Sequence, residues 1–166
     1  MIRAVRRLPD HVLKQRAAPV DPLDPEVVAL AEDLVETMRV SPGCVGLAAP
    51  QIGVSLRVFS MDVTGHRKAR SCAGLVVLAN PEIVAADDPR PAREGCMSVP
   101  DFTGDVRRAF RVTMSGTVPG TGQRVTVDAD AIEARALLHE LDHLDGLLFI
   151  DRVAGPHAVF DRKRYL

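Results

Sequence analysis

The stretch DAIEARALLHELDHLDG, residues 130–146, is the element around which the fold is predicted to form. Asp130 is placed as the N-cap, and Glu133, three residues later, completes the positions of a capping box. The pattern ends just before Gly146, a residue type that commonly follows the last turn of a helix. The sequence therefore predicts a helix over 130–144.

Within that helix, the pentapeptide HELDH is typical of a metal site. His139 and His143 are four residues apart, so they project from one face and can bind one cation, with Glu140 beside them. A catalytic metal takes a third protein ligand and keeps one position open, so another residue must contribute. The alternative is a surface helix whose histidines and acids form ordinary ion pairs.

Cys96, in the stretch EGCMSVP at 94–100, is a candidate for that third ligand. Nearby prolines make the stretch neither a convincing helix nor a run of core residues, and a thiolate there could complete the metal shell. A small buried hydrophobe is the commoner role of a free cysteine, so both interpretations stay open. The chain has 3 cysteines, which cannot all pair with one another.

The rest of the chain predicts scaffold elements without regular alternation of strands and helices. A helix is expected over 24–40, with Asp24 as N-cap and Pro25 at its first position. Residues 41–53, SPGCVGLAAPQIG, are interpreted as a binding loop, because Gly, Ala and Pro let the backbone approach another molecule closely. Strands are expected at 56–61, 74–78 and 82–85, and a hairpin over 111–127 that turns at 119–122. We therefore expect an α+β fold in which antiparallel or mixed β-sheets pack around the HELDH helix, with an N-terminal scaffold helix.

Length and charge limit the function classes. A chain of 166 residues is expected to form a single domain, residues 1–166. With 21 basic against 22 acidic residues, no general attraction to DNA or anionic lipid is expected. The N-terminus lacks the apolar core of a secretory signal, and no apolar run approaches the roughly 20 residues that span a bilayer. These patterns predict a cytoplasmic protein.

Three motifs occur together: GLAAPQ at 46–51, EGCMS at 94–98 and HELDH at 139–143. In this order and at these separations they resemble the bacterial, metal-dependent peptide deformylase family. HExxH alone would leave metalloproteases open, whereas HExDH with an upstream EGC is similar to deformylases. The resemblance implies an enzyme that removes the N-formyl group from the N-terminal formylmethionine of nascent polypeptides and releases formate.

The resemblance also implies a role for individual residues. The implied ligands of one divalent metal ion per chain are Cys96, His139 and His143. Ferrous iron is the ion expected in the cell, and zinc, nickel or cobalt could occupy the same site. Metal-bound water would attack the formyl carbon, with Glu140 as general base and then general acid. Gln51 and the backbone N–H of Met97 would donate to the oxygen that becomes negative.

The substrate is expected to bind in an extended form, with Val45 and Gly46 offering main-chain groups as an added strand does. Gly46 is counted with the catalytic residues as well as with the substrate-binding ones. The candidate pocket for the methionine side chain consists of Cys44, Val45, Ile132, Ala136 and the ring of His139. The alternative for these residues is packing in the core.

Three positions depart from the family pattern. Cys44 stands where a glycine is usual, and its side chain could narrow the pocket mouth, alter the preferred first residue or expose a thiol to oxidation. Met97 replaces a leucine of similar volume, so little effect is expected. Leu138 replaces the glutamine common before the first histidine and would remove a hydrogen bond that tunes the metal. Asp142 is expected to orient a ligand or an adjacent arginine.

Two other functions stay open. A catalytically weak or inactive paralogue would bind metal and formyl-peptide, or a partner, without efficient turnover. A metallopeptidase would cleave an internal amide and release two peptide fragments. The partners considered are N-formylmethionyl peptides and, for the basic C-terminus, the ribosome near the exit tunnel. Solvent exposure is preferred for Arg162, Lys163 and Arg164, because three basic residues make a small electrostatic footprint.

Overall fold

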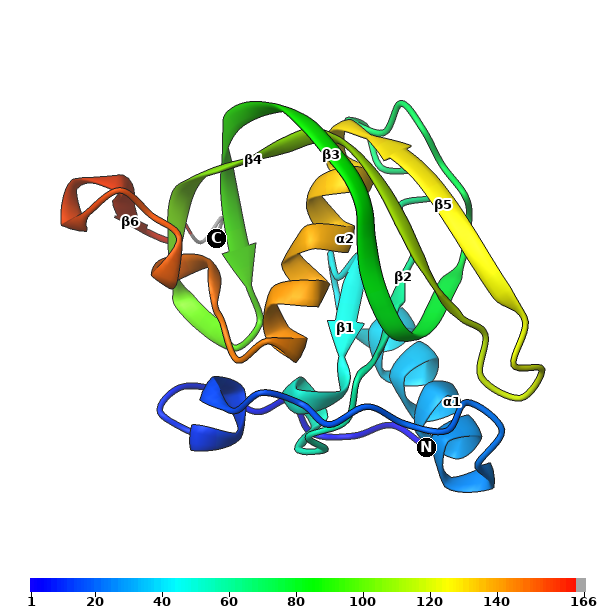
Figure 1. Cartoon of the computed structure of the whole chain (residues 1–166). Coiled ribbons are helices and arrows are strands. Elements are labelled where there is room, and N and C mark those ends of the chain that lie inside the picture. Colours follow the sequence, from blue (N-terminus) through cyan, green and yellow to red (C-terminus); the bar gives the residue numbers. More distant parts are fainter. Residues whose placement is uncertain (164–166) are drawn as a thin grey trace.

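A computed structural model describes residues 1–163, and a curved antiparallel sheet wraps around helix α2 in it (Figure 1). The strands are β1 (Gly46–Ala48), β2 (Val58–Met61), β3 (Val76–Cys96), β4 (Val99–Thr117), β5 (Arg124–Asp130) and β6 (Val159–Asp161). The helices are α1 (Pro25–Val40) and α2 (Ala131–Leu144), with short 3-10 turns η1 (His11–Lys14), η2 (Ala49–Ile52), η3 (Phe149–Asp151) and η4 (Pro156–Ala158). The strand order is β1-β2-β3-β4-β5, with β6 paired to β4, and all these pairs are antiparallel. The expected α+β fold around the HELDH helix is confirmed.

Helix α1 is the predicted N-terminal scaffold helix. The Asp24 carboxylate accepts a hydrogen bond from the N–H of Glu26 at 2.9 Å, and Pro25 occupies the first turn, where a missing N–H costs nothing. Its buried apolar residues recur at helical spacing: Val27, Leu30, Ala31, Leu34 and Met38. They share one hydrophobic cluster with Leu47 of β1 and Val58 of β2. Burial of this face therefore fixes α1 beside the short strands that carry part of the site.

Helix α2 has the predicted span, but the predicted capping box is wrong. Asp130 is the N-cap without a side-chain bond to the helix, because its carboxylate accepts from the N–H of Ser71 at 2.9 Å. Glu133 accepts from the hydroxyl of Ser71 at 2.8 Å and from the N–H of Ala73 at 2.6 Å. The chain enters the helix through Ala131 at φ 49°, outside the helical region. A distant loop therefore takes the two carboxylates that would otherwise have capped the helix.

The two strands predicted at 74–78 and 82–85 are parts of one long strand, β3. Asn80 has φ 49°, and the pairing register with β4 shifts between Ala79 and Glu82, so Asn80-Pro81 forms a bulge instead of a break. Beyond Ala79, β3 pairs with β4 alone among the described residues, and an edge strand tolerates prolines such as those at 89 and 91. The stretch 94–100, predicted to be neither a helix nor a run of core residues, contains the end of β3 at residues 94–96 and the start of β4 at residues 99–100.

The other strand predictions are confirmed. The strand expected at 56–61 is β2, two residues shorter at its start. The hairpin expected over 111–127 is formed by β4 and β5, which pair from Arg111 opposite Asp130 to Thr117 opposite Arg124. Gly120 and Gly122 both have positive φ in the connecting turn, as the sequence pattern requires.

The segment 41–53 is more ordered than the predicted binding loop. It contains β1 and η2, and Leu47, Ala48 and Ala49 are fully buried. Small side chains let this segment pass between α1 and α2, both of which contact β1. Figure 1 shows β1 running beside α2. Within residues 1–163, no helix combines the length and apolar character needed to cross a membrane.

Candidate metal centre and active site

The three predicted metal ligands come together between β3 and α2. Cys96 is the last residue of β3, and His139 and His143 lie one turn apart on α2. Their ligating atoms all lie within 4.8 Å of one another, and Cys96 Sγ is 3.4 Å from His143 Nε2. Cys96 is 6% exposed and His143 1% exposed. The curvature of β3 and β4 around α2 is what brings a strand end against the helix face that carries both histidines (Figure 1).

Cys96 is held in its ionised form. Gln51 Nε2 and the N–H of Ser98 both lie 3.4 Å from Sγ and donate to it. Burial opposes ionisation, but the charge of His143 and hydrogen bonds from both histidines hold the pKa of the thiol well below its ordinary value. A thiolate is the form in which cysteine binds metals, so the commoner role of inert buried cysteine does not describe Cys96.

The chemistry of the donor set fits a divalent first-row metal ion. One thiolate and two imidazoles are three protein ligands, which leaves a coordination position open for a reactant. Beside them, Glu140 Oε2 is buried without a hydrogen-bond partner among the described residues. A buried carboxylate oxygen is costly to leave unpaired, so this position favours a bound polar molecule next to the ligands. The three side chains therefore form a metal site with an acid beside its open side.

Glu94 fixes the orientation of His139. Its carboxylate lies 2.9 Å from His139 Nδ1, which leaves Nε2 of that ring for the metal. Arg108 donates to the same carboxylate through Nε at 2.7 Å and a terminal nitrogen at 3.0 Å, and Arg135 donates at 2.6 Å. Burial works against the charged carboxylate, but the bonds from His139 and Arg108 lower the pKa of Glu94 to about 2. Glu94 is therefore ionised at neutral pH. It belongs to the EGCMS motif at 94–98, but the motif alone did not indicate that it orients His139.

The network continues from Arg108 to the second acid of the HELDH motif. Arg108 donates to Asp142 at 2.7 Å, and Arg152 donates to both oxygens of Asp142 at 3.0 and 2.8 Å. Burial raises the pKa of Asp142, but the hydrogen bonds and charges of Arg152 and Arg108 outweigh it and lower that pKa. Asp142 thus orients an arginine, as expected, and that arginine supports Glu94 and through it His139.

Glu140 lies under the metal ligands and is 3% exposed. Burial raises its pKa to about 7, against the opposing charges of His139 and His143. The backbone of Gly46 packs directly on this carboxylate, since a Cβ at that position would lie 2.8 Å from Glu140 Cδ. Gly46 must therefore be a glycine for the Glu140 side chain to keep its place.

Gln51, the side-chain donor that the family resemblance implies, is buried at 2% exposure. Its Oε1 accepts from the N–H of Ala48 at 3.0 Å, and this bond fixes which end of the amide faces the metal ligands. Its Nε2 donates to Ser98 Oγ at 3.2 Å and toward Cys96. The side chain therefore directs a donor at the ligand cluster. Met97 lines the same pocket, and its side chain packs with the apolar cluster under α1.

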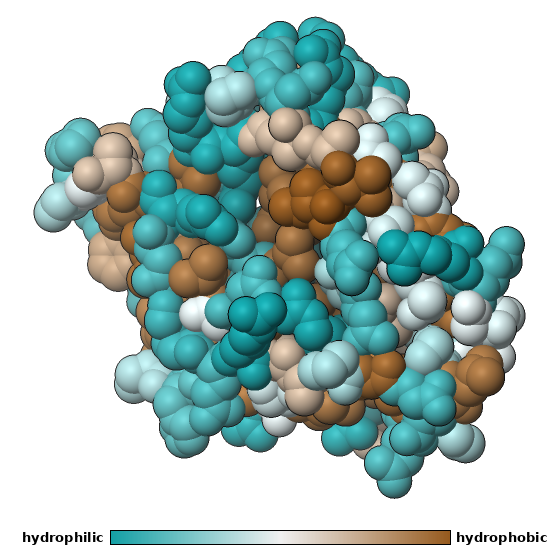
Figure 2. Space-filling view, viewed as in Figure 1, coloured by the Kyte–Doolittle hydropathy of each residue, from teal (hydrophilic) through white to brown (hydrophobic). Residues whose placement is uncertain are grey.

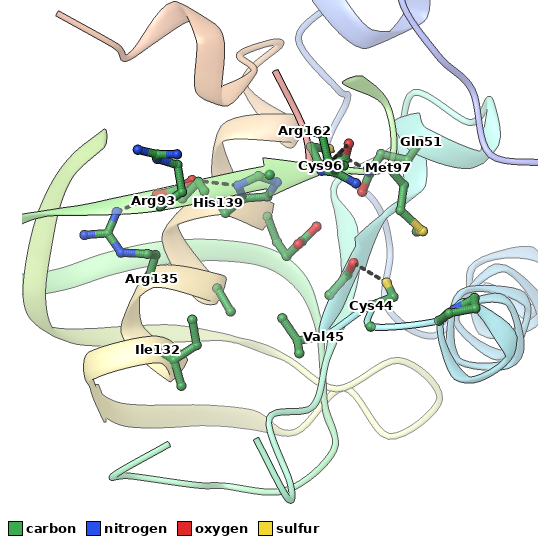
Figure 3. A pocket seen from close by; sticks show the side chains of 17 residues that line it. Cys44, Val45, Gln51, Arg93, Cys96, Met97, Ile132, Arg135, His139 and Arg162 are labelled. Carbon is green, nitrogen blue, oxygen red and sulfur yellow. Dashed lines mark hydrogen bonds and ion pairs between the residues drawn. The ribbon is translucent and has the colours of Figure 1, made fainter. Parts of the chain in front are cut away.

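The ligands open into a pocket of about 220 Å³. Figure 2 shows hydrophobic residues in a hollow near the middle of one face, bordered by hydrophilic side chains. In Figure 3, Val45 and Ile132 face one another across the apolar end, and Arg93 and Arg135 lie on the side of His139. The predicted pocket residues all line it: Cys44, Val45, Gly46, Ile132, Ala136 and His139. The structure thus brings together all the residues proposed from the sequence for metal ligation, catalysis and substrate binding.

One of the three basic residues near the C-terminus differs from its sequence interpretation. Arg162, expected in solvent, lines the pocket and places a guanidinium nitrogen 3.5 Å from the carbonyl oxygen of Cys96. Lys163 is exposed, as expected, and Arg164 lies outside the described residues.

Leu138 packs against the hydrophobic cluster around α2, so the position faces the core. A distance of two residues puts Glu94 and Cys96 on the same side of a strand, and this was the signal that could have identified Glu94.

Comparison with known proteins agrees with this geometry. A family model described as Polypeptide deformylase matches residues 2–158. A peptide deformylase of Halothermothrix orenii is 44% identical over 149 residues, which cover 90% of this chain and 92% of that protein. The crystal structure of a peptide deformylase from Thermotoga maritima matches with a TM-score of 0.82 at 37% identity, over 93% of this chain and 99% of that one. A class I type b peptide deformylase from Acinetobacter baumannii, with Met-Ala-Ser bound, matches with a TM-score of 0.82 at 33% identity, over 92% and 99%.

The family-model match extends over the segments that build the site. It spans the β1 segment, the end of β3 and the HELDH helix, all of which lie within residues 2–158. The metal cluster of Cys96, His139 and His143 lies where these segments meet. The chain therefore belongs to the peptide deformylase family of metal-binding hydrolases.

Proposed function

We propose that this enzyme removes the formyl group from the N-terminal formylmethionine of nascent polypeptides, with Cys96, His139 and His143 holding one divalent metal ion. The single observation that carries the proposal is the buried carboxylate of Glu140 beside this thiolate and imidazole cluster, whose Oε2 has no hydrogen-bond partner within residues 1–163. When bound, the ion acts as a Lewis acid and lowers the pKa of water from 15.7 to about 7. We propose ferrous iron as the ion in the cell; zinc, nickel or cobalt suit the same donor set.

Glu140 is proposed as the general base and acid of the reaction. It takes a proton from the attacking water and then delivers it to the departing amine nitrogen, so that formate and a free N-terminus result. Its pKa of about 7, raised by burial, lies near neutral pH, where a group can both accept and return a proton. The contact with Gly46 supports the role, because it holds the carboxylate at the pocket wall.

Gln51 and Met97 are proposed to stabilise the oxygen of the formyl group as it becomes negative. The amide of Gln51 is already oriented by Ala48, so its Nε2 faces the ligand cluster, and the formyl oxygen would replace Ser98 Oγ or Cys96 Sγ as one of its acceptors. Met97 follows Cys96 directly and lines the pocket, so its main-chain N–H is the proposed second donor. Preorganised donors of this kind favour the transition state over the flat formyl group of the substrate.

The substrate is proposed to bind as an extended strand along Val45 and Gly46, with its methionine side chain in the apolar end of the pocket. Val45, Ile132 and Ala136 supply that apolar surface, and Cys44 lies at its margin. The Acinetobacter baumannii relative was solved with Met-Ala-Ser, a peptide of this kind. We propose that residues 1–166 act as one catalytic domain in the cytoplasm, on N-formylmethionyl peptides, with contact to the ribosome near its exit tunnel as a further partner.

The roles are tested by measuring formate released from formyl-Met-Ala-Ser by protein purified anaerobically with ferrous iron. Glu140→Gln is expected to lower kcat by about 10²- to 10⁴-fold, and Gln51→Leu by about 10²- to 10³-fold, at equal metal content. The exposed Glu82→Gln serves as control and should leave the rate unchanged. Peptide binding to a filled site without release of formate would favour a non-catalytic paralogue, and two peptide fragments would identify a metallopeptidase.

A further inference from the structure

The edge of β1 offers its main-chain groups to the pocket at Gly46. Among the described residues, β1 is paired with β2 alone and leaves its other edge unpaired. Gly46 lies opposite Met61, and the N–H of Asp62 donates to the carbonyl of Val45 at 2.8 Å. In an antiparallel ladder this bond makes Gly46 and Met61 a non-hydrogen-bonded pair, so the N–H and C=O of Gly46 point away from β2. Both groups are therefore directed to the side where an extended peptide would pair.

The carbonyl of Gly46 already has a side-chain donor. The thiol of Cys44 donates to it with an Sγ to oxygen distance of 3.0 Å, the interaction drawn beside Cys44 in Figure 3. Burial and then the charge of Glu140 raise the pKa of Cys44 to about 12, so the thiol keeps its proton at neutral pH. Both residues line the pocket together with Glu140. The thiol thus occupies an acceptor that an incoming peptide needs.

We infer that Cys44 is a positioning residue that tunes substrate affinity through the Gly46 carbonyl: its S–H competes with a backbone N–H of the bound peptide for that oxygen. The inference rests on the proposed function, because the competing N–H belongs to the formyl-peptide. The Gly46 carbonyl points away from β2, where both donors would meet it, so the thiol weakens or displaces the hydrogen bond from the peptide. Displacement of the thiol raises the free energies of the bound substrate and of the transition state equally. Such a change raises KM and leaves kcat unchanged.

The affinity of the product peptide tests the inference without requiring turnover. Met-Ala-Ser is titrated by calorimetry into the metal-loaded protein and into its Cys44→Ala and Cys44→Ser variants. Loss of the competing donor in Cys44→Ala is expected to tighten binding by about fivefold, which corresponds to about 1 kcal/mol. The serine hydroxyl is a stronger donor than a thiol, so Cys44→Ser should bind the peptide as weakly as the wild type or more weakly. A purely steric effect gives another order, because serine is smaller than cysteine and would also bind more tightly.

Kinetics and spectroscopy supply readouts that a packing role would not move. The KM for formyl-Met-Ala-Ser should fall about fivefold in Cys44→Ala with kcat unchanged, while Cys44→Ser keeps a KM at or above that of the wild type. In the wild-type protein, the infrared S–H stretching band of Cys44 should shift when Met-Ala-Ser binds. A variant is needed only to assign this band to Cys44. Equal peptide affinities in all three proteins, or an unmoved S–H band, would overturn the inference. Absence of formate release would contradict the proposed function, whereas the order of the three peptide affinities would still test the inference about Cys44.

Discussion

Replacement of Glu94 by glutamine is expected to destabilise the protein, because it removes the charge that the buried arginine network surrounds. Glu94 is 7% exposed, and Arg108, at 6%, donates two hydrogen bonds to it. In Glu94→Gln the guanidinium keeps Asp142 as its only carboxylate partner, and Asp142 is shared with Arg152. Breaking a buried ion pair by removing one partner costs about 3–5 kcal/mol.

The pKa of Glu94 gives a second route to the same magnitude. The carboxyl has a pKa of about 2 in the folded protein, against an ordinary value of 4.5, because bonds from His139 and Arg108 outweigh its burial. At about 1.4 kcal/mol for each pKa unit, the difference contributes about 3 kcal/mol to stability. Because the folded pKa is the lower one, this contribution is complete above pH 4.5 and is lost as the pH falls from 4.5 toward 2.

Urea unfolding of the metal-free protein, followed by circular dichroism, measures the effect. At pH 7 the free energy of unfolding of Glu94→Gln should lie about 3–5 kcal/mol below that of the wild type, and the gap should narrow below pH 4.5. The control is Asp105→Asn, which makes the same chemical change in the exposed ion pair with Arg93 and should cost about 0–1 kcal/mol. The affinity for metal should also fall, by about 10- to 100-fold, because His139 loses its orienting acceptor. A loss below about 1 kcal/mol in Glu94→Gln, equal to that of the control, would refute the reasoning.

Three further perturbations have expected outcomes. The pKa of Glu140 is raised by burial to about 7 from 4.5, so its burial costs the folded state nothing below pH 4.5 and about 3 kcal/mol once the pH exceeds 7. Metal-free Glu140→Gln should therefore be more stable than the wild type by about 3 kcal/mol at pH 8 and equally stable at pH 4, as measured by urea unfolding. Gly46→Ala places a Cβ against the Glu140 carboxylate and should lower kcat/KM for formyl-Met-Ala-Ser by about 10²-fold, and an unchanged value would show that the contact does not matter. Phe149→Ala should cost about 3–5 kcal/mol of unfolding free energy, because Phe149 is 1% exposed in the cluster that includes Cys96, and a cost under about 1 kcal/mol would contradict that packing.

The sequence was most informative where a feature depends on neighbouring residues. The helices over 24–40 and 130–144 were predicted with correct spans, because their apolar spacing and punctuation are local. The same holds for the paired histidines, whose separation of one helical turn places them on one face. The assignment of Cys96 and Gln51 came from resemblance to a family, since neither residue has a local pattern that distinguishes a ligand or donor from core.

The predictions that were wrong concern segments whose structure depends on contacts with distant parts of the chain. Two separate strands were predicted at 74–78 and 82–85, but both belong to β3, which is an edge strand over most of its length and tolerates prolines. The predicted capping box does not form, because Asp130 and Glu133 accept hydrogen bonds from Ser71 and Ala73 instead. Burial of Leu47 and Ala48 depends on two helices that pack around β1. Such contacts join residues far apart in the chain, so periodicity and spacing could not have revealed them.

The central claim is that the cluster of Cys96, His139 and His143 carries out deformylation with Glu140 as base. The most direct measurement follows formate released from formyl-Met-Ala-Ser as anaerobic, metal-free protein is titrated with ferrous iron. Release is expected to rise in proportion to bound iron, to reach its maximum at one ion per chain, and to stay low throughout an identical titration of Glu140→Gln. A site filled with one ion per chain that binds the peptide and releases no formate would contradict it.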